Sequence, residues 1–261
     1  MGLLDAKVAI LTGGAFGIGR ATALHLATEG AAVVIGDIKT DKATDVADEI
    51  SSAGGQAIAQ HCDVADERSV VELMDTAVRT FGGIDLLDHN AAWTDFLRDS
   101  DALDADLDTW DRVHQVNTKG ALLLARHAIP SMISRGGGAI VNISSGSASI
   151  GEITRVAYGV SKAGVEQLTR HLANRYGRNG IRANAVAPGF ILTASSAKGV
   201  PESYRTLLAD QNPTGRLGAP DDIAHVVAFL LSDRAGYING QVIHVDGGTQ
   251  IAGTLPGPSG P

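Results

Sequence analysis

The sequence predicts an α/β protein with a doubly wound parallel sheet, and three observations support this fold class. Short β-rich segments alternate with longer helical segments along most of the 261 residues. The strand segments are almost wholly apolar, which is typical of strands buried on both faces of a parallel sheet. A glycine-rich turn joins the first strand to the first helix. Because 44% of the residues are hydrophobic, the chain can bury one large core, and we expect a single Rossmann-like domain over residues 1–252.

The alternation of the segments sets the expected order of the elements. Strands are expected at residues 7–11, 32–36, 57–60, 84–89, 138–143, 181–186 and 241–245. Helices are expected at residues 18–29, 41–53, 67–81, 107–133, 156–177 and 221–231. Asp41 and Asp66 are expected as N-caps, and Gly30, Gly54 and Gly82 stand where helices should end.

Three segments do not follow this alternation. Residues 93–106 and 190–215 are long insertions after strands, and we expect them to border a substrate. The tail 253–261 is rich in Gly, Pro and Ser, and we expect it to be flexible.

The composition argues against several classes of function. A net charge of −8 and a pI near 5.4 disfavour nucleic acid or a membrane as partner, because both are bound chiefly through an excess of Lys and Arg. No leader-like segment and no bilayer-spanning apolar run is present in the sequence, so we expect a cytoplasmic protein. The single cysteine, Cys62, is interpreted as a small core residue. The eight histidines show no zinc-binding spacing, so no metal site is expected.

The turn after the first strand has the sequence TGGAFGIG over residues 12–19. Glycines there allow close approach of the backbone to a pyrophosphate, and the N-terminus of the following helix supplies amides and a favourable dipole. A glycine-rich turn alone is weak evidence, because a structural tight turn is also compatible with it. Asp37, however, ends the second strand 18 residues after Gly19, where a carboxylate can accept hydrogen bonds from an adenosine ribose. Together the two features predict a dinucleotide site that favours NAD.

A second group of residues has the chemistry of proton transfer. Tyr158 and Lys162 stand four residues apart in a helical segment, so their side chains share one face. A neighbouring ammonium lowers the pKa of a phenol, which would allow the tyrosine to take a proton. Ser145 lies 13 residues before Tyr158 at the end of a strand, where its hydroxyl could hold a substrate oxygen. Its neighbour Ser144 is the alternative for this role.

These motifs resemble those of the short-chain dehydrogenase/reductase family over about the whole chain. The family's glycine motif has three residues between its first two glycines, as Gly13 and Gly17 do. The family's catalytic tetrad, Asn-Ser-Tyr-Lys, falls on Asn117, Ser145, Tyr158 and Lys162, and the 13-residue offset selects Ser145 over Ser144. The chain departs from the family where Asn-Asn-Ala-Gly is common, since residues 89–92 are HNAA here. We interpret His89 as a strand-end histidine with satisfied hydrogen bonds.

The resemblance also implies a set of cofactor-binding residues. It places Asp63 and Val64 beside the adenine ring, and the backbone of Ile191 on the carboxamide of the nicotinamide. The whole set expected to bind NAD is Gly13, Phe16, Gly17, Ile18, Gly19, Asp37, Asp63, Val64, Asn90, Ala91, Tyr158, Lys162, Pro188, Gly189, Ile191 and Thr193. Lys162 would hold the nicotinamide ribose, and Asn117 a water molecule that links Lys162 to solvent.

The expected function is therefore NAD-dependent interconversion of a secondary alcohol and a ketone, with Tyr158 as general acid and base. An NADP-dependent 3-oxoacyl-carrier-protein reductase is the alternative within enzymes, and a non-catalytic dinucleotide-binding protein is the alternative outside them. By resemblance, residues 107–133, 156–177 and 238–248 would form the interfaces of a homotetramer.

The substrate is less closely defined by the sequence. Residues on segments expected to border the cleft are Trp93, Phe96, Glu152, Arg155 and Tyr204, and the aromatic ones suit an apolar or ring-containing alcohol. Arg155 could pair with a substrate carboxylate, but an ion pair with Glu152 is the preferred interpretation.

Overall fold

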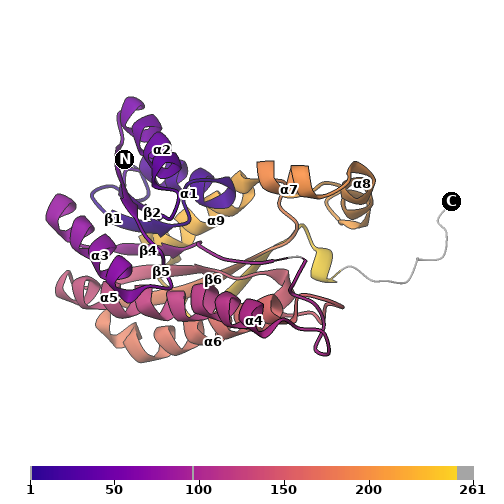
Figure 1. The fold of residues 1–261 in the computed structure, drawn as a ribbon. Coiled ribbons are helices and arrows are strands. Elements are labelled where there is room, and N and C mark those ends of the chain that lie inside the picture. Colours follow the sequence, from indigo (N-terminus) through magenta and orange to yellow (C-terminus); the bar gives the residue numbers. More distant parts are fainter. Residues whose placement is uncertain (1, 96, 252–261) are drawn as a thin grey trace.

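A parallel sheet forms the centre of the protein (Figure 1). The computed structural model describes residues 2–95 and 97–251, and within them seven strands lie in the order β3-β2-β1-β4-β5-β6-β7. The strands are β1 (Val8–Thr12), β2 (Ala32–Asp37), β3 (Gln56–His61), β4 (Leu86–His89), β5 (Gly138–Ile143), β6 (Ile181–Pro188) and β7 (Val242–Val245). The strand order reverses between β1 and β4, so the predicted doubly wound α/β fold is confirmed.

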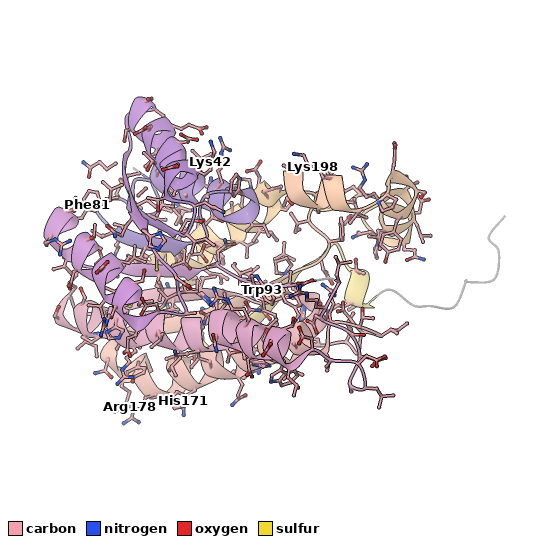
Figure 2. The ribbon with its side chains drawn as sticks, in the orientation of Figure 1. Lys42, Phe81, Trp93, His171, Arg178 and Lys198 are labelled. Carbon is pink, nitrogen blue, oxygen red and sulfur yellow. The ribbon has the colours of Figure 1, made fainter. Side chains whose placement is uncertain are left out.

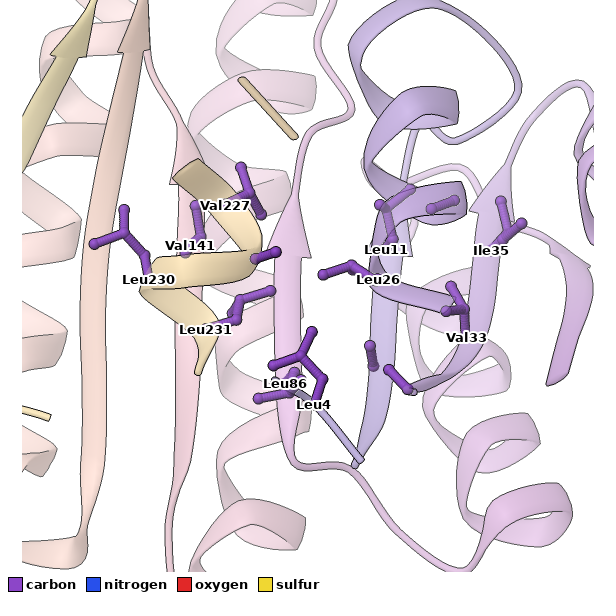
Figure 3. Packing of buried hydrophobic residues seen from close by; sticks show 14 of the residues in the cluster. Leu4, Leu11, Leu26, Val33, Ile35, Leu86, Val141, Val227, Leu230 and Leu231 are labelled. Atoms are coloured by element: carbon purple, nitrogen blue, oxygen red, sulfur yellow. The ribbon is translucent and has the colours of Figure 1, made fainter. Parts of the chain in front are cut away.

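Helices cover both faces of the sheet (Figure 1). On one face, α1 (Gly17–Thr28), α2 (Thr40–Ser52) and α9 (Pro220–Leu231) bury their apolar residues in a shared cluster, part of which is drawn in Figure 3. On the other face lie α3 (Glu67–Phe81), α5 (Gly120–Ser134) and α6 (Val156–Tyr176). The remaining helices are α4 (Leu107–His114), which precedes α5, and the short α7 (Ala194–Gly199) and α8 (Glu202–Gln211) after β6.

The expected burial of the strands on both faces holds in the middle of the sheet but not at its edges. Every residue of β1 and β4 is buried, whereas β3 at one edge has exposed ends at Gln56 and His61 and half-buried residues between them. The reason is that an edge strand has a neighbouring strand on one side only, so its other side is left open to solvent.

Most element boundaries agree with the sequence to within two residues, and the differences have local causes. Asp66 is the N-cap of α3, as predicted, and accepts a hydrogen bond from the Arg68 amide at 3.1 Å. The prediction for Asp41 is wrong, because α2 begins one residue earlier, with Lys39 as N-cap, and Asp41 lies in its first turn. The predicted helix 107–133 is continuous, but a π-helical turn at Gln115–Lys119 separates α4 from α5.

The carboxyl ends of the central strands meet at one edge of the sheet. Thr12 of β1 pairs with His89 of β4, which in turn pairs with Asn142 of β5. The glycine-rich turn and the segments that follow β4 and β5 therefore begin next to one another, and this is the edge at which doubly wound sheets bind ligands.

Two expectations fall on parts of the chain outside the described residues: the flexible tail 253–261 and the place of Phe96 at the cleft. Within residues 2–95 and 97–251, no helix combines the length and the apolar character needed to cross a membrane.

Candidate active site

The glycine-rich turn packs directly against the end of β4. Gly13 has a positive φ of +72°, and a Cβ there would lie 2.8 Å from the Cα of Ala91. Asn90 donates from its Nδ2 to the Gly13 carbonyl at 3.0 Å, which fixes the turn against the strand. Any residue larger than glycine would separate these two segments. The predicted residues Gly13, Asn90 and Ala91 are thus brought together.

The start of α1 can receive an anion. The helix begins at Gly17, and its N-cap, Phe16, provides no side-chain hydrogen bond, so the first amides of the helix are left for another partner. Thr193 lies across from this point, since a Cβ at Gly17 would be 3.2 Å from the Thr193 methyl group. The uncapped helix end and the glycine cradle fit a dinucleotide pyrophosphate, with Thr193 on the far side of the turn.

Asp37 is held beside the same turn. Its carboxylate is 9% exposed and accepts hydrogen bonds from the Ala15 amide at 3.0 Å and the Lys39 amide at 2.8 Å. These contacts fix the carboxylate at the end of β2, and each oxygen keeps a lone pair for a further donor. The Lys39 residue is exposed. The position of Asp37 therefore fits a ribose with free hydroxyl groups.

The other predicted cofactor residues lie at the same edge. Asp63 accepts from the Ala65 amide at 2.9 Å and from Arg112 at 3.4 Å, and Val64 packs against Gly120 at the start of α5. Gly189 directly follows β6, and a Cβ on it would lie 2.8 Å from the Cα of Asp246, so no side chain fits there. Ile191 forms a β-bridge with Gly218, in the loop before α9. The predicted cofactor residues here are Pro188, the last residue of β6, and Gly189, Ile191 and Thr193 after it.

Tyr158 and Lys162 lie one turn apart on α6, with the Lys162 ammonium 5.6 Å from the centre of the tyrosine ring. Lys162 is 1% exposed and donates to the carbonyl of Ile143 at 2.7 Å. Burial lowers the pKa of Lys162 to about 8. The helical spacing has therefore placed the two side chains together, next to the end of β5.

The pKa of Tyr158 differs from the expectation. Burial of the hydroxyl raises the pKa of Tyr158; the hydrogen bond from Ser145 and the charge of Arg155 lower it in part, and Glu152 raises it further. The expected lowering by Lys162 is wrong for this structure, because desolvation dominates and the ammonium is directed to the Ile143 carbonyl.

The two serines of the doublet have different surroundings. Ser144 is 2% exposed and donates to Glu166 Oε1 at 2.9 Å, in the interior. Ser145 is half-buried; its Oγ accepts from the Ser147 amide and donates to Ser147 Oγ, both at 3.2 Å. Ser145 also lies near enough to Tyr158 to lower the pKa of the phenol in part. The geometry favours Ser145 as the serine that acts beside the tyrosine.

Asn117 lies in the π-helical turn and is fully buried. Its side-chain oxygen accepts from the Trp93 amide at 2.7 Å, and its nitrogen donates to the Trp93 carbonyl at 3.1 Å and to Ser161 Oγ at 3.0 Å. The side chain thus ties the segment after β4 to α6. Figure 2 shows Trp93 between the α7 and α4 sides of the molecule.

Sequence reasoning missed Asp99, which caps the helix that carries Tyr158. Its carboxylate is 3% exposed and accepts from the amides of Ala157 and Tyr158, both at 2.9 Å. The N-cap residue of α6, Arg155, does not cap the helix with its side chain. The residue before Val156 is an arginine, which is not a preferred N-cap. Nothing in the local sequence, however, could show that the acceptor comes from a residue 58 positions away from Ala157.

We expect Asp99→Ala to lower the thermal unfolding midpoint by several degrees, because two buried amides would lose their acceptors, at about 1–3 kcal/mol each. Asp99→Asn keeps one oxygen acceptor and should lose less. Thermal unfolding followed by circular dichroism measures both variants, and an Asp99→Ala midpoint equal to that of the wild type would show that the cap contributes nothing.

Two adjacent residues of β4 are buried without hydrogen-bond partners. Both oxygens of Asp88 and both ring nitrogens of His89 lack a partner within 3.5 Å in the described part of the chain. The expectation of a satisfied His89 is therefore wrong, because the facing Asn142 directs its nitrogen to Thr169 at 2.9 Å. Burial, with the charge of Lys162, lowers the pKa of His89 to about 3, and burial raises the pKa of Asp88 to about 8.

Comparison with known proteins gives matches over nearly the whole chain. A family model described as enoyl-(acyl carrier protein) reductase matches residues 13–250. The cis-4-hydroxycyclohexanecarboxylate dehydrogenase of Sinomonas cyclohexanicum is 43% identical over 242 residues, which are 93% of this chain and 96% of the relative. The 3-oxoacyl-[acyl-carrier-protein] reductase of Thermotoga maritima is 38% identical, with 95% and 99% covered.

A solved structure is also similar. A 7α-hydroxysteroid dehydrogenase complexed with NADH and 7-oxo glycochenodeoxycholic acid superposes with a TM-score of 0.89 at 36% identity, covering 94% of each chain.

Proposed function

The chain belongs to the short-chain dehydrogenase/reductase family, and from this premise we propose that it is an NAD-dependent dehydrogenase in which Tyr158 transfers the proton. Its relatives are oxidoreductases that act on CH–OH groups, and the chain is an oxidoreductase of this kind. What supports the finer proposal is that Tyr158 and Lys162 lie together next to the end of β5, at the same edge of the sheet as the glycine-rich turn.

A nicotinamide dinucleotide held by the glycine-rich turn and Asp37 would supply the acceptor of hydride from the alcohol carbon in oxidation and the donor of hydride in reduction. Tyr158 as phenolate takes the hydroxyl proton during oxidation and gives it back during reduction. Ser145 donates a hydrogen bond to the substrate oxygen and holds it beside the phenol. Lys162 adds positive charge near the phenolate, and Asn117 fixes the segment after β4 against α6.

The cofactor preference follows from Asp37. The extra phosphate of NADP would lie beside this carboxylate and be repelled, whereas the ribose of NAD can donate hydrogen bonds to it. We expect kcat/KM with NAD to exceed that with NADP by at least about tenfold, which needs only ~1.4 kcal/mol. Asp37→Ala should reduce this difference in kcat/KM between NAD and NADP. Steady-state kinetics with both cofactors on one substrate test this, and an unmodified enzyme that prefers NADP would contradict it.

We further expect a homotetramer. Large apolar side chains on the outer faces of α4, α5 and α6 are exposed in a single chain, among them Leu107 at 72%, Leu122 at 49% and Val160 at 47%. Such faces are usually covered by another subunit. Light scattering at micromolar concentration measures the mass, and a monomer at that concentration would refute the expectation. We also expect a cytoplasmic location.

For the substrate, we propose a secondary alcohol or ketone carried on a ring. The names of two relatives specify such alcohols, a hydroxycyclohexane carboxylate and a 7α-hydroxysteroid. The alternative, a 3-oxoacyl-carrier-protein reductase, is favoured by the Thermotoga relative. It is disfavoured by charge, because residues 95–111 beside the cleft contain seven aspartates and one arginine, which would repel an acidic carrier protein.

A panel of substrates decides between the two functions. Cyclic and linear secondary alcohols, their ketones and a 3-oxoacyl carrier substrate would be assayed with NAD and NADP by nicotinamide absorbance. The proposal expects NAD-linked turnover of cyclic alcohols. Turnover confined to the carrier-bound substrate with NADPH would support the alternative instead.

A further inference from the structure

A chain of polar contacts links Ser145 to Tyr158 along the loop between them. Ser145 donates to Ser147 Oγ at 3.2 Å, and Ser147 donates to Glu152 Oε1 at 3.0 Å. Arg155 donates from Nη2 to the same Glu152 oxygen and, at 3.3 Å, to Ser147. The Arg155 guanidinium also lies over the Tyr158 ring, 5.3 Å from its centre. The ion pair between Glu152 and Arg155, expected from the sequence, is therefore connected to two members of the tetrad.

The backbone at Arg155 indicates that this arrangement is specific. Arg155 has φ 64° and ψ 41°, in the left-handed region, and Ala6 is the only other non-glycine residue with positive φ in the described ranges. This conformation costs a residue with a Cβ about 1 kcal/mol or more. Glycine would relieve the strain, so the contacts of the arginine side chain have to offset it.

The two side chains of the pair are partly shielded from solvent. The side chains of Glu152 and Arg155 are 24% and 22% exposed, and Ser147 is 8% exposed. An ion pair in such surroundings acts on its neighbours more strongly than a pair on an open surface, because the effective dielectric constant is lower.

We propose, on the premise that Tyr158 transfers the proton, that Glu152 and Arg155 are positioning residues for the reaction. Arg155 holds positive charge against the Tyr158 ring and favours the phenolate. Glu152 accepts a hydrogen bond from Ser147, whose amide donates to Ser145 Oγ, and so sets the position of Ser145 while the hydroxyl proton of Ser145 can be given to the substrate oxygen. The two residues act through the tetrad and do not themselves exchange a proton with the substrate.

The charges around Tyr158 make the proposal testable by pH. Lys162 lies on the same helix, Asp99 binds the Tyr158 amide from the segment after β4, and Glu152 and Arg155 approach from the loop before α6. Arg155 and Glu152 have opposite charges, so removal of each should move the ionisation of Tyr158 in opposite directions. A loss of local structure would not produce this pair of signs.

The experiment compares Arg155→Met and Glu152→Gln with the wild type in the kcat/KM profile for alcohol oxidation with NAD, extended above pH 10 because burial raises the pKa of Tyr158. We expect the limb of the profile that rises with pH to move to higher pH by about half a unit or more in Arg155→Met. In Glu152→Gln, which keeps an acceptor for Ser147 and Arg155, it should move to lower pH. Arg155→Lys keeps the positive charge and should restore most of the wild-type position.

Lys7→Met is the matched control, because it removes the positive charge of an ion pair with Asp233 (3.8 Å) at the opposite end of the sheet. NADH binding and thermal unfolding confirm that each variant is folded. Unmoved limbs in both test variants, or shifts in the same direction, would overturn the positioning role while the proposed function stands. Failure of the wild type to oxidise any alcohol with either cofactor would instead overturn the proposed function.

Discussion

Replacement of Tyr158 with phenylalanine is expected to abolish turnover while NADH binding is retained. The substitution removes the group that transfers the proton, a contribution of about a hundredfold to ten-thousandfold. It keeps the ring over which the Arg155 guanidinium and the Lys162 ammonium lie. Nicotinamide absorbance measures the rate, and NADH fluorescence measures binding.

The matched variant is Lys162→Met, which should harm both turnover and binding. Lys162 is buried against the end of β5, and the resemblance to the family also gives it the nicotinamide ribose as a partner. If the Tyr158→Phe enzyme kept more than a few per cent of the wild-type rate, another group would have to supply the proton, and the proposed mechanism would be wrong.

Replacement of Asp88 with valine is expected to stabilise the protein at pH 8 by several kcal/mol. The Asp88 carboxyl lies in β4 between Leu11 and Val141 of the neighbouring strands, without a hydrogen-bond partner within the described residues. Burial raises its pKa to about 8, so the folded protein retains a proton that the unfolded chain releases near pH 4. Valine removes this penalty and suits a buried strand.

The pH range in which Asp88 has its clearest effect on stability depends on the titration of two other buried groups, His89 and Lys162. Asp88 makes stability fall as pH rises from about 4 to 8, because its pKa is raised in the folded state. His89, with its pKa lowered to about 3, makes stability rise until its unfolded value near 6.5, so the two effects oppose each other below that pH. Lys162, with a pKa of about 8, makes stability rise only above pH 8. Stability should therefore fall by about 2 kcal/mol between pH 6.5 and 8.

Thermal unfolding midpoints at pH 6.5, 7.2 and 8 measure this decline. The decline of the midpoint with pH should disappear in Asp88→Val. It should also disappear in Asp88→Asn, which keeps the shape of the side chain but does not titrate. A decline that persists unchanged in both variants would mean that Asp88 is not its source.

The fold was predictable because its signals are local. The apolar strand runs, the glycine motif and the helical spacing of Tyr158 and Lys162 each occupy a few neighbouring residues, and each predicts one element or one shared face. The cap of α6 by Asp99 and the unpartnered side chain of His89 depend instead on which segments meet in three dimensions. The direction of the Tyr158 pKa could not be predicted either, because it depends on how deeply the hydroxyl is buried.

The segment between β4 and α4 is attached to the rest of the protein at two points. The Asn117 side chain holds the backbone of Trp93, and Asp99 with the following residue holds the start of α6 through side-chain and backbone bonds. The described residues between and beyond these attachments, 94, 95, 97, 98 and 101–105, bear little of this connection. An engineer could therefore exchange them for the corresponding residues of a relative to redirect substrate choice. Such a graft would leave the proton-transfer geometry in place as long as Asp99 and the Trp93 backbone were kept.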